Sequence, residues 1–140
     1  MITIYSKHHL LISVLVGGTI GVFTTNSAIE IVIVVLYSGF VGVFIDLDHF
    51  LISRVKTGNW TALLNCIQTP IQSLFYQKGI FREGEVEPSE RIVSHLVIIG
   101  GGVSILWFIS KYWAFVSLVV LYMHLLTDSI ADTFDLYERV

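Results

Sequence analysis

Histidines and aspartates at helical spacing are the residues of this chain that could do chemistry. His124 and Asp128 are four residues apart, so a helix would place both side chains on one face. Asp46 and His49 stand at the two ends of the run Asp-Leu-Asp-His. Imidazole nitrogens and carboxylate oxygens are ligands that ions such as Zn²⁺ and Mn²⁺ take in proteins. The pattern therefore predicts a divalent-metal site, which the remaining elements of the chain must assemble.

Composition excludes most soluble classes of protein. Of the 140 residues, 54% are hydrophobic and only 14% are charged, which is too apolar for a soluble enzyme or a disordered chain. The single cysteine, Cys66, excludes an intramolecular disulfide. With 8 Lys+Arg against 11 Asp+Glu, the chain lacks the broad basic surface that a nucleic-acid partner requires. What remains is a small integral membrane protein.

Four segments are apolar enough to cross a bilayer, whose ~30 Å hydrocarbon core takes about 17–25 helical residues. The predicted spans are residues 9–24, 28–45, 92–109 and 113–127. Three-residue connections join the first two and the last two spans into helical hairpins. Glycines in three of the spans are expected to let helix backbones approach closely, although glycine is also simply common in membrane helices. The predicted fold is all-α, a bundle of four short transmembrane helices in a single domain, residues 1–140.

An even number of spans puts both termini and the long connection, residues 46–91, on one side of the membrane. Seven of the eight basic residues belong to that side, and Lys111 is opposite. The seven are Lys7, Arg54, Lys56, Lys78, Arg82, Arg91 and Arg139. Because basic residues concentrate on the cytoplasmic side, we predict a multi-pass protein of the cell membrane with both termini in the cytoplasm.

The long connection carries a helical pattern of its own. Apolar residues recur there at spacings of three and four: Trp60, Leu63, Leu64, Ile67, Ile71, Leu74 and Phe75. Asn59 is placed to cap the start of this helix and Pro70 to kink it. We predict a cytoplasmic amphipathic helix along the membrane surface between spans two and three. A helix packed on the end of the bundle would show the same periodicity.

The N-terminus allows a second interpretation. Lys7 precedes an apolar run that ends in Thr-Asn-Ser-Ala, as in a secretory signal peptide with a small-residue cleavage site. The weak basic region and the Gly-Gly-x-x-Gly pattern favour a retained packing helix instead. Retention matters because cleavage would remove His8 and His9.

Placed on this topology, all five histidines fall at the cytoplasmic ends of the spans. Ionisable groups at membrane depth are costly and are kept mostly where they function. The expected metal ligands are His9, Asp46, His49, His95, His124 and Asp128. His9 is preferred over His8 because Leu10 and Leu11 follow it directly into the membrane. Zinc is the first expected ion and manganese the second, with one or two ions bound.

Three further polar residues have expected roles beside the ligands. Asp48 is out of step with Asp46 on a helix, so we expect it to be a general base or to hydrogen-bond a ligand. Arg91 is expected to hold an anionic group of the substrate, such as a phosphate. Asp132 continues the stripe of Asp128 and is expected on a solvated helical face.

The same residues resemble the pattern of a known family, the predicted membrane-bound metal-dependent hydrolases of bacteria and archaea. That family has an N-terminal His and the motifs Asp-x-Asp-His, His-Arg-x-x-Thr-His-Ser and His-x-x-x-Asp. The matching positions here are His9, 46–49, 90–96 and 124–128. Glu90 stands where the family has His, and Leu96 stands where it has Ser. The resemblance implies a metal site in a membrane bundle and hydrolase chemistry.

The functional prediction is a metal-dependent hydrolase that acts on a lipid-like or membrane-adsorbed substrate. An ion at the site would activate water and polarise the scissile bond. The alternative is a non-catalytic protein whose ion only stabilises the bundle. Carboxylates argue against a haem site, and the absence of acids at mid-membrane argues against transport. Membrane lipids are the expected partners, a second copy of the chain is an open alternative, and no nucleic acid is expected.

Overall fold

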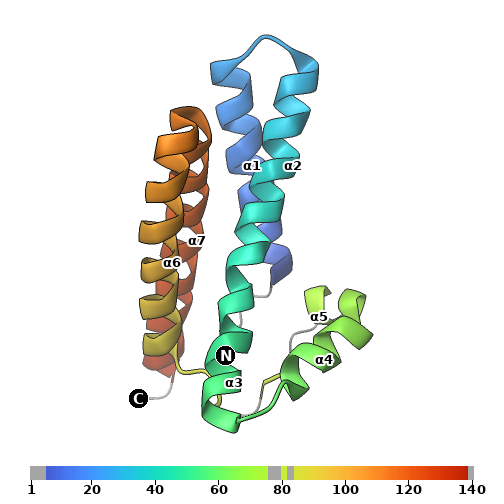
Figure 1. Cartoon of the computed structure of the whole chain (residues 1–140), viewed down its shortest axis with the longest axis vertical. Coiled ribbons are helices and arrows are strands. Elements are labelled where there is room, and N and C mark those ends of the chain that lie inside the picture. Colours follow the sequence, from blue (N-terminus) through green and yellow to red (C-terminus); the bar gives the residue numbers. More distant parts are fainter. Residues whose placement is uncertain (1–5, 76–79, 82–83, 139–140) are drawn as a thin grey trace.

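The computed structural model of the chain describes residues 6–75, 80–81 and 84–138 (Figure 1). All regular elements among these residues are helices, which confirms the predicted all-α class. In order they are α1 (Ser6–Thr24), α2 (Ala28–Phe44), a 3₁₀ turn η1 (Ile45–Leu47), α3 (Asp48–Thr57), α4 (Thr61–Gln68), α5 (Pro70–Phe75), α6 (Pro88–Ile109) and α7 (Lys111–Glu138). Lys78, Arg82 and Arg139, which the topology argument counts, lie outside the described residues.

Four helices are long and apolar enough to cross a membrane. Their candidate spans are Lys7–Thr24, Ala28–Thr57, Pro88–Ile109 and Lys111–Phe134. They form two hairpins, α1–α2 and α6–α7, whose tight turns lie at the same end of the bundle (Figure 1). The start of α1, the start of α6, the end of α7 and all of α3 lie at the opposite end, which we call the α3 end. The arrangement agrees with the predicted up-and-down topology.

Two helices extend ten residues or more beyond the predicted ends of their spans. The second continues through η1 into α3 and stops at Gly58, whose left-handed φ of 75° lets its N–H bond to the Arg54 carbonyl at 3.0 Å. The fourth runs on from Thr127 to Glu138, because this stretch contains no Gly or Pro to end it. The end of an apolar segment in the sequence therefore does not mark the end of the helix at these two positions.

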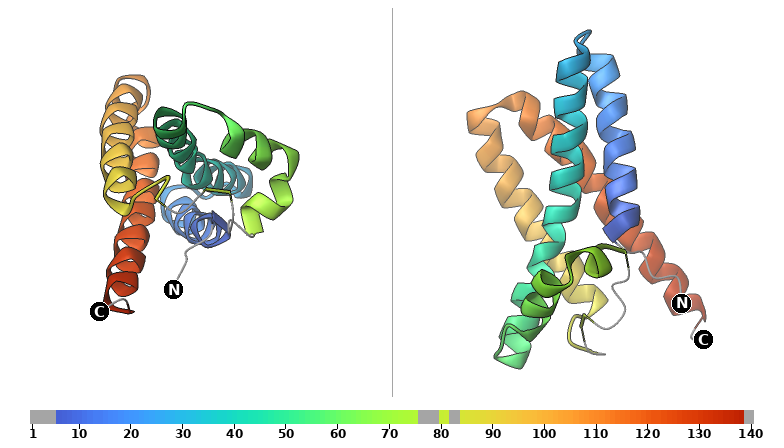
Figure 2. Two further views of the ribbon diagram at one scale, coloured as in Figure 1. Left: turned by 90° about the horizontal axis from the view of Figure 1, so that it is seen from below. Right: turned by 90° about the vertical axis from the view of Figure 1, so that its right-hand side faces the viewer.

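The predicted helix in the long connection is present as two short pieces. α4 and α5 are separated at Thr69, directly before Pro70, as expected from the residue that breaks a helix. Asn59 Oδ1 accepts a hydrogen bond from the Thr61 N–H at 3.0 Å at the start of α4. Seen from the α3 end, α4 and α5 project to one side of the bundle (Figure 2).

The helices pack unevenly. α1 and α2 lie close together, and α7 packs against both of them and against α6. Val34, Val116 and Val120 form one apolar cluster between the hairpins, and Ile45, Ile99 and Leu121 form a second. Direct contact between α2 and α6 is sparse. The bundle is therefore tight on the α1 side and loose between α2 and α6.

Candidate metal centre

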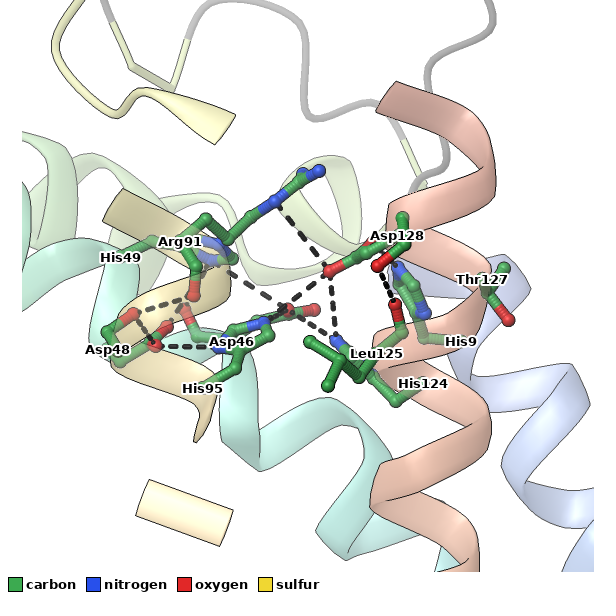
Figure 3. Close-up of polar contacts among 12 residues, drawn as sticks. His9, Asp46, Asp48, His49, Arg91, His95, His124, Leu125, Thr127 and Asp128 are labelled. Atoms are coloured by element: carbon green, nitrogen blue, oxygen red, sulfur yellow. Dashed lines mark hydrogen bonds and ion pairs between the residues drawn. The ribbon is translucent and has the colours of Figure 1, made fainter. Parts of the chain in front are cut away.

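The six residues predicted as metal ligands converge at the α3 end (Figure 3). They come from five elements: His9 from α1, Asp46 from η1, His49 from α3, His95 from α6, and His124 and Asp128 from α7. His9, His95, His124 and Asp128 have at most 3% of their surface exposed. His8, the neighbour that the sequence analysis set aside, is exposed. A polar cluster is thus buried in the part of the bundle where the two hairpins meet.

The Nε2 atoms of His95 and His124 each lie near two carboxylate oxygens at separations like those between the ligands of one ion. His124 Nε2 lies 3.2 Å from Asp46 Oδ1 and 3.5 Å from Asp128 Oδ2. His95 Nε2 lies 3.7 Å from Asp46 Oδ1 and 3.5 Å from Asp128 Oδ2. Ligand atoms that stand 2.0–2.2 Å from a tetrahedral ion are about 3.3–3.6 Å from one another. The residues present fit a zinc-like ion.

The other ring nitrogen of each central histidine fixes which nitrogen faces the cluster. His124 Nδ1 lies 2.9 Å from the Gly42 carbonyl oxygen, which can only accept, so Nδ1 donates. His95 Nδ1 donates to Asp48 Oδ2 at 2.7 Å. In the neutral rings both Nε2 atoms then carry lone pairs that face carboxylate oxygens. These nitrogens and Asp128 Oδ2 are buried without a hydrogen-bond partner, and a cation between them would satisfy all three.

Asp48 and Asp46 approach His95 from opposite sides of its ring. Asp48 Oδ2 accepts from His95 Nδ1 and also from the Ser94 hydroxyl, whereas Asp46 Oδ1 faces His95 Nε2. The 3₁₀ turn makes this possible, because three residues per turn reduce the angle between positions i and i+2. Asp48 thus hydrogen-bonds His95, a candidate ligand, which is compatible with one of its two expected roles. Its role as general base stays a prediction.

His9 and His49 extend the cluster on its two flanks. His9 Nε2 lies 3.0 Å from Asp128 Oδ1, and its ring stacks on that of His124 with centroids 3.8 Å apart. His49 Nδ1 donates to the Asp46 carbonyl at 2.9 Å, which leaves Nε2 buried and without a hydrogen-bond partner. Three overlapping ligand groups result: His9, His124 and Asp128; Asp46, His95 and His124; Asp48, His49 and His95. The overlap is compatible with one or two ions.

Arg91 is held by carboxylates of α7. Its Nη2 donates to both oxygens of Asp132 at 2.6 and 2.7 Å, and its Nε lies 3.7 Å from Asp128 Oδ2. Asp132 is therefore partly buried and ties α7 to α6, contrary to the expectation of a solvated face. The sequence signal for this contact is the position of Asp132, one helical turn after Asp128. The expected role of Arg91 toward a substrate anion stays a prediction.

The two departures from the family pattern lie away from the cluster. Glu90 forms a capping box with Glu87 at the start of α6 and an ion pair with Lys56 at 2.7 Å. Leu96 is 52% exposed on the outer face of α6. Neither position is among the ligand groups found in the described residues. The two positions that differ from the pattern therefore lie outside the candidate ligand set.

Sequence reasoning missed two groups that support the ligands. Ser94 hydrogen-bonds Asp48, and a signal for it existed in its position next to His95. The contact between the Gly42 carbonyl and His124 had no signal in the sequence. Every residue carries a backbone carbonyl, so residue type does not indicate which one accepts the hydrogen bond. Comparison of the chain with protein-family models, with curated proteins and with solved structures finds no match.

Proposed function

We propose that the chain is a membrane-embedded metal-dependent hydrolase with its metal centre at the α3 end. One observation carries the proposal: the Nε2 atoms of His95 and His124 face two carboxylates at the separations of a tetrahedral site, with no other partner. The motif resemblance points to the same residues. Zinc is the first candidate ion because its usual ligands are nitrogen and carboxylate oxygen in this geometry, and manganese is the second.

Each group of the centre has a distinct task in this proposal. A bound divalent ion supplies the Lewis acidity that activates water and polarises the bond to be cleaved. Asp46, His95, His124 and Asp128 hold the ion, and Asp48 keeps His95 in the binding orientation. Asp48 Oδ1 and His49 Nε2 have no hydrogen-bond partner, so both are available to accept a proton.

The membrane setting is proposed from the distribution of charge and apolar surface. Arg54, Lys56 and Arg91 belong to the α3 end, and Lys111 begins α7 at the opposite end, so the α3 end would face the cytoplasm of a cell-membrane protein. Leu64 and Ile67 of α4 are exposed, as expected of a helix that lies on the membrane surface. A centre at this interface favours a lipid-like or membrane-adsorbed substrate.

The first test is the metal content of detergent-purified protein, measured by elemental analysis. We expect stoichiometric zinc or manganese in the wild type and its loss in His124→Ala and in Asp128→Ala. His8→Ala is the matched control, because His8 is an exposed histidine beside the buried His9, and it should keep the metal. Well-folded wild-type protein that stays metal-free after reconstitution would overturn the proposal, and protonated imidazoles would then satisfy the carboxylates.

A second candidate function is a purely structural ion, favoured by the near-complete burial of His95, His124 and Asp128. The two functions separate when metal is removed by chelation. If the ion is structural, its removal should lower Tm, and the metal-loaded protein should not hydrolyse phospholipid or lipid-phosphate substrates. A hydrolase predicts turnover that disappears with the metal and returns when the metal is added back.

A further inference from the structure

An apolar cavity of about 480 Å³ lies between the α2–α3 helix and α6, with α7 at its base. Its size falls within the range of small-molecule sites, about 300–1,000 Å³. Lining side chains include Phe40, Phe44, Leu51, Ile98, Val103 and Leu121. Phe40, Phe44 and Ile98 are at least 42% exposed, so the cavity opens sideways, away from the bundle axis. We call it the α2–α6 groove.

One end of the groove reaches a residue that borders the candidate metal centre. Among the described residues that line it, only Asp48 is charged, and Asp48 is the residue that orients His95. Toward the other end, Tyr37 hydrogen-bonds Ser117 at 2.6 Å, so its hydroxyl is already satisfied. Tyr37 and Asp48 are separated by about 16 Å of helix. The groove is thus an elongated apolar channel with a single polar end.

Small residues keep the groove open. Gly102 lines it, and a Cβ added at Gly100, Gly101 or Gly102 would meet nothing within 4 Å. Most of the groove lies between two of the candidate membrane spans; in a bilayer this part would face hydrocarbon, and an apolar cavity there would stay dry. Its occupant must therefore be apolar, narrow and able to enter from the side, with a polar group at the level of Asp48. A lipid acyl chain meets all of these requirements.

We propose that the α2–α6 groove binds one acyl chain of a membrane lipid and thereby places the lipid's polar end at the metal centre. Binding of the acyl chain rests on the groove itself, whereas the role of that lipid as a substrate rests on the proposed hydrolase. The headgroup side of the lipid lies beside Asp48 and His95, and the terminal part of the chain lies toward Tyr37.

Photolabelling tests the binding of the chain. The full-length protein is placed in vesicles of phosphatidylethanolamine and phosphatidylglycerol that contain a phosphatidylglycerol with a diazirine midway along one acyl chain. After irradiation, adducts are mapped by peptide mass spectrometry. Val97 is 69% exposed and does not line the groove, while its neighbour Ile98 is 42% exposed and does. We expect Ile98 to be labelled more than Val97; labelling that follows exposure would overturn the proposal.

Two glycine variants give a matched control. Gly102→Phe fills the groove, and Gly101→Phe adds the same ring at the neighbouring position, outside the lining. We expect Gly102→Phe to lose the adducts on Ile98 and Phe44 and Gly101→Phe to keep them. Equal labelling in both variants would overturn the proposal. A second copy of the chain is the competing occupant of the groove. If native mass spectrometry shows a wild-type dimer with an unlabelled groove and a monomeric Gly102→Phe variant, a second copy fills the groove and the proposal is overturned.

The substrate role has separate readouts. Metal content should be unchanged in both glycine variants. Hydrolysis of lipid phosphates should rise with chain length in the wild type, and Gly102→Phe should lose this dependence. A metal-free wild type with groove labelling intact would overturn only the hydrolase. Turnover that is independent of chain length, in a protein that keeps its metal, would overturn only the substrate role of the groove.

Discussion

Glycines in the two hairpins look alike in the sequence and do opposite things in the structure. In α1 and α2, a Cβ on Gly42 would overlap the side chain of Ser13, and a Cβ on Gly17 would overlap Ser38. In α6, the three consecutive glycines from Gly100 to Gly102 would meet nothing within 4 Å. The first group allows two backbones to touch, as in small-residue packing of membrane helices. The second group leaves a helix surface bare.

The comparison shows how one molecule combines a rigid part with an accessible part. The α1–α2 side supplies the Gly42 carbonyl that fixes His124, so close packing there sets ligand geometry. The α6 side is separated from α2 along most of its length, so side-chain volume there determines what can enter the groove. Glycine therefore allows close packing that fixes the position of His124 in one hairpin, and it leaves the groove open in the other.

The largest expected effect comes from Gly42→Val, which breaks the tight side. The added side chain would overlap Ser13 and force α1 and α2 apart, so we expect a loss of about 3 kcal/mol of stability. Metal content should fall as well, because the displaced backbone at position 42 would move its carbonyl away from His124 Nδ1. Thermal unfolding in detergent and elemental analysis measure the two effects. Gly101→Val is the control; a similar Tm for the two variants would contradict the comparison.

A smaller effect is expected from Asp48→Asn, which weakens the contact between α3 and α6 at the polar end of the groove. The amide oxygen can still accept from His95 Nδ1 but lacks the negative charge that strengthens this hydrogen bond, so we expect metal affinity to fall by about 10- to 100-fold. Competition with a chromogenic chelator measures this affinity. Unchanged affinity would show that His95 is held by other contacts.

Gly101→Ala should change stability in the opposite direction to Gly42→Ala. A Cβ on Gly101 meets no neighbour, and alanine lowers the backbone entropy of the unfolded chain, so we expect about 0.5–1 kcal/mol of stabilisation. Gly42→Ala should destabilise because its Cβ overlaps Ser13. The measurement is Tm for the two alanine variants side by side. The same sign for both would remove the distinction between the hairpins.

The smallest effect is expected from Glu90→Gln. Glu90 and Lys56 pair at 2.7 Å between α6 and α3, but both side chains are about one-third exposed, and surface pairs of this kind contribute little. Tm and metal content should stay near the wild-type values. A marked loss of metal would show that position 90, where the resembling family has His, still takes part in the centre.

The convergence of the candidate ligands was predictable, because successive spans of an up-and-down bundle run in alternating directions. An up-and-down bundle brings the start of one helix beside the end of the next, so His9, Asp46, His95 and Asp128 had to share one end. The break before Pro70 was predictable from proline chemistry. The lengths of α3 and α7 were not, because apolar periodicity reports the surroundings of a helix and not where the helix stops.

The remaining features depend on how each helix is rotated about its axis, and a single sequence does not specify this. A period of 3.6 residues defines an apolar face, yet several neighbours can cover it. The bond between Arg91 and Asp132 and the separation of α2 from α6 are both consequences of rotation. The glycines of α6 illustrate the ambiguity, since a small-residue stripe fits close packing and a groove equally well.

The lengths of the helices have a consequence for how an ion reaches the centre. About 20 residues of helix cover a ~30 Å hydrocarbon core; counted from Ala28 this reaches Leu47, and counted from Lys111 it reaches Ile130. In the proposed membrane setting, Asp46 and Asp128 would stand within a turn of the boundary, and α3 and the end of α7 would project into water. Exchange with the aqueous compartment on that side needs no passage through the bilayer, so occupancy of the centre would follow the free-ion concentration there.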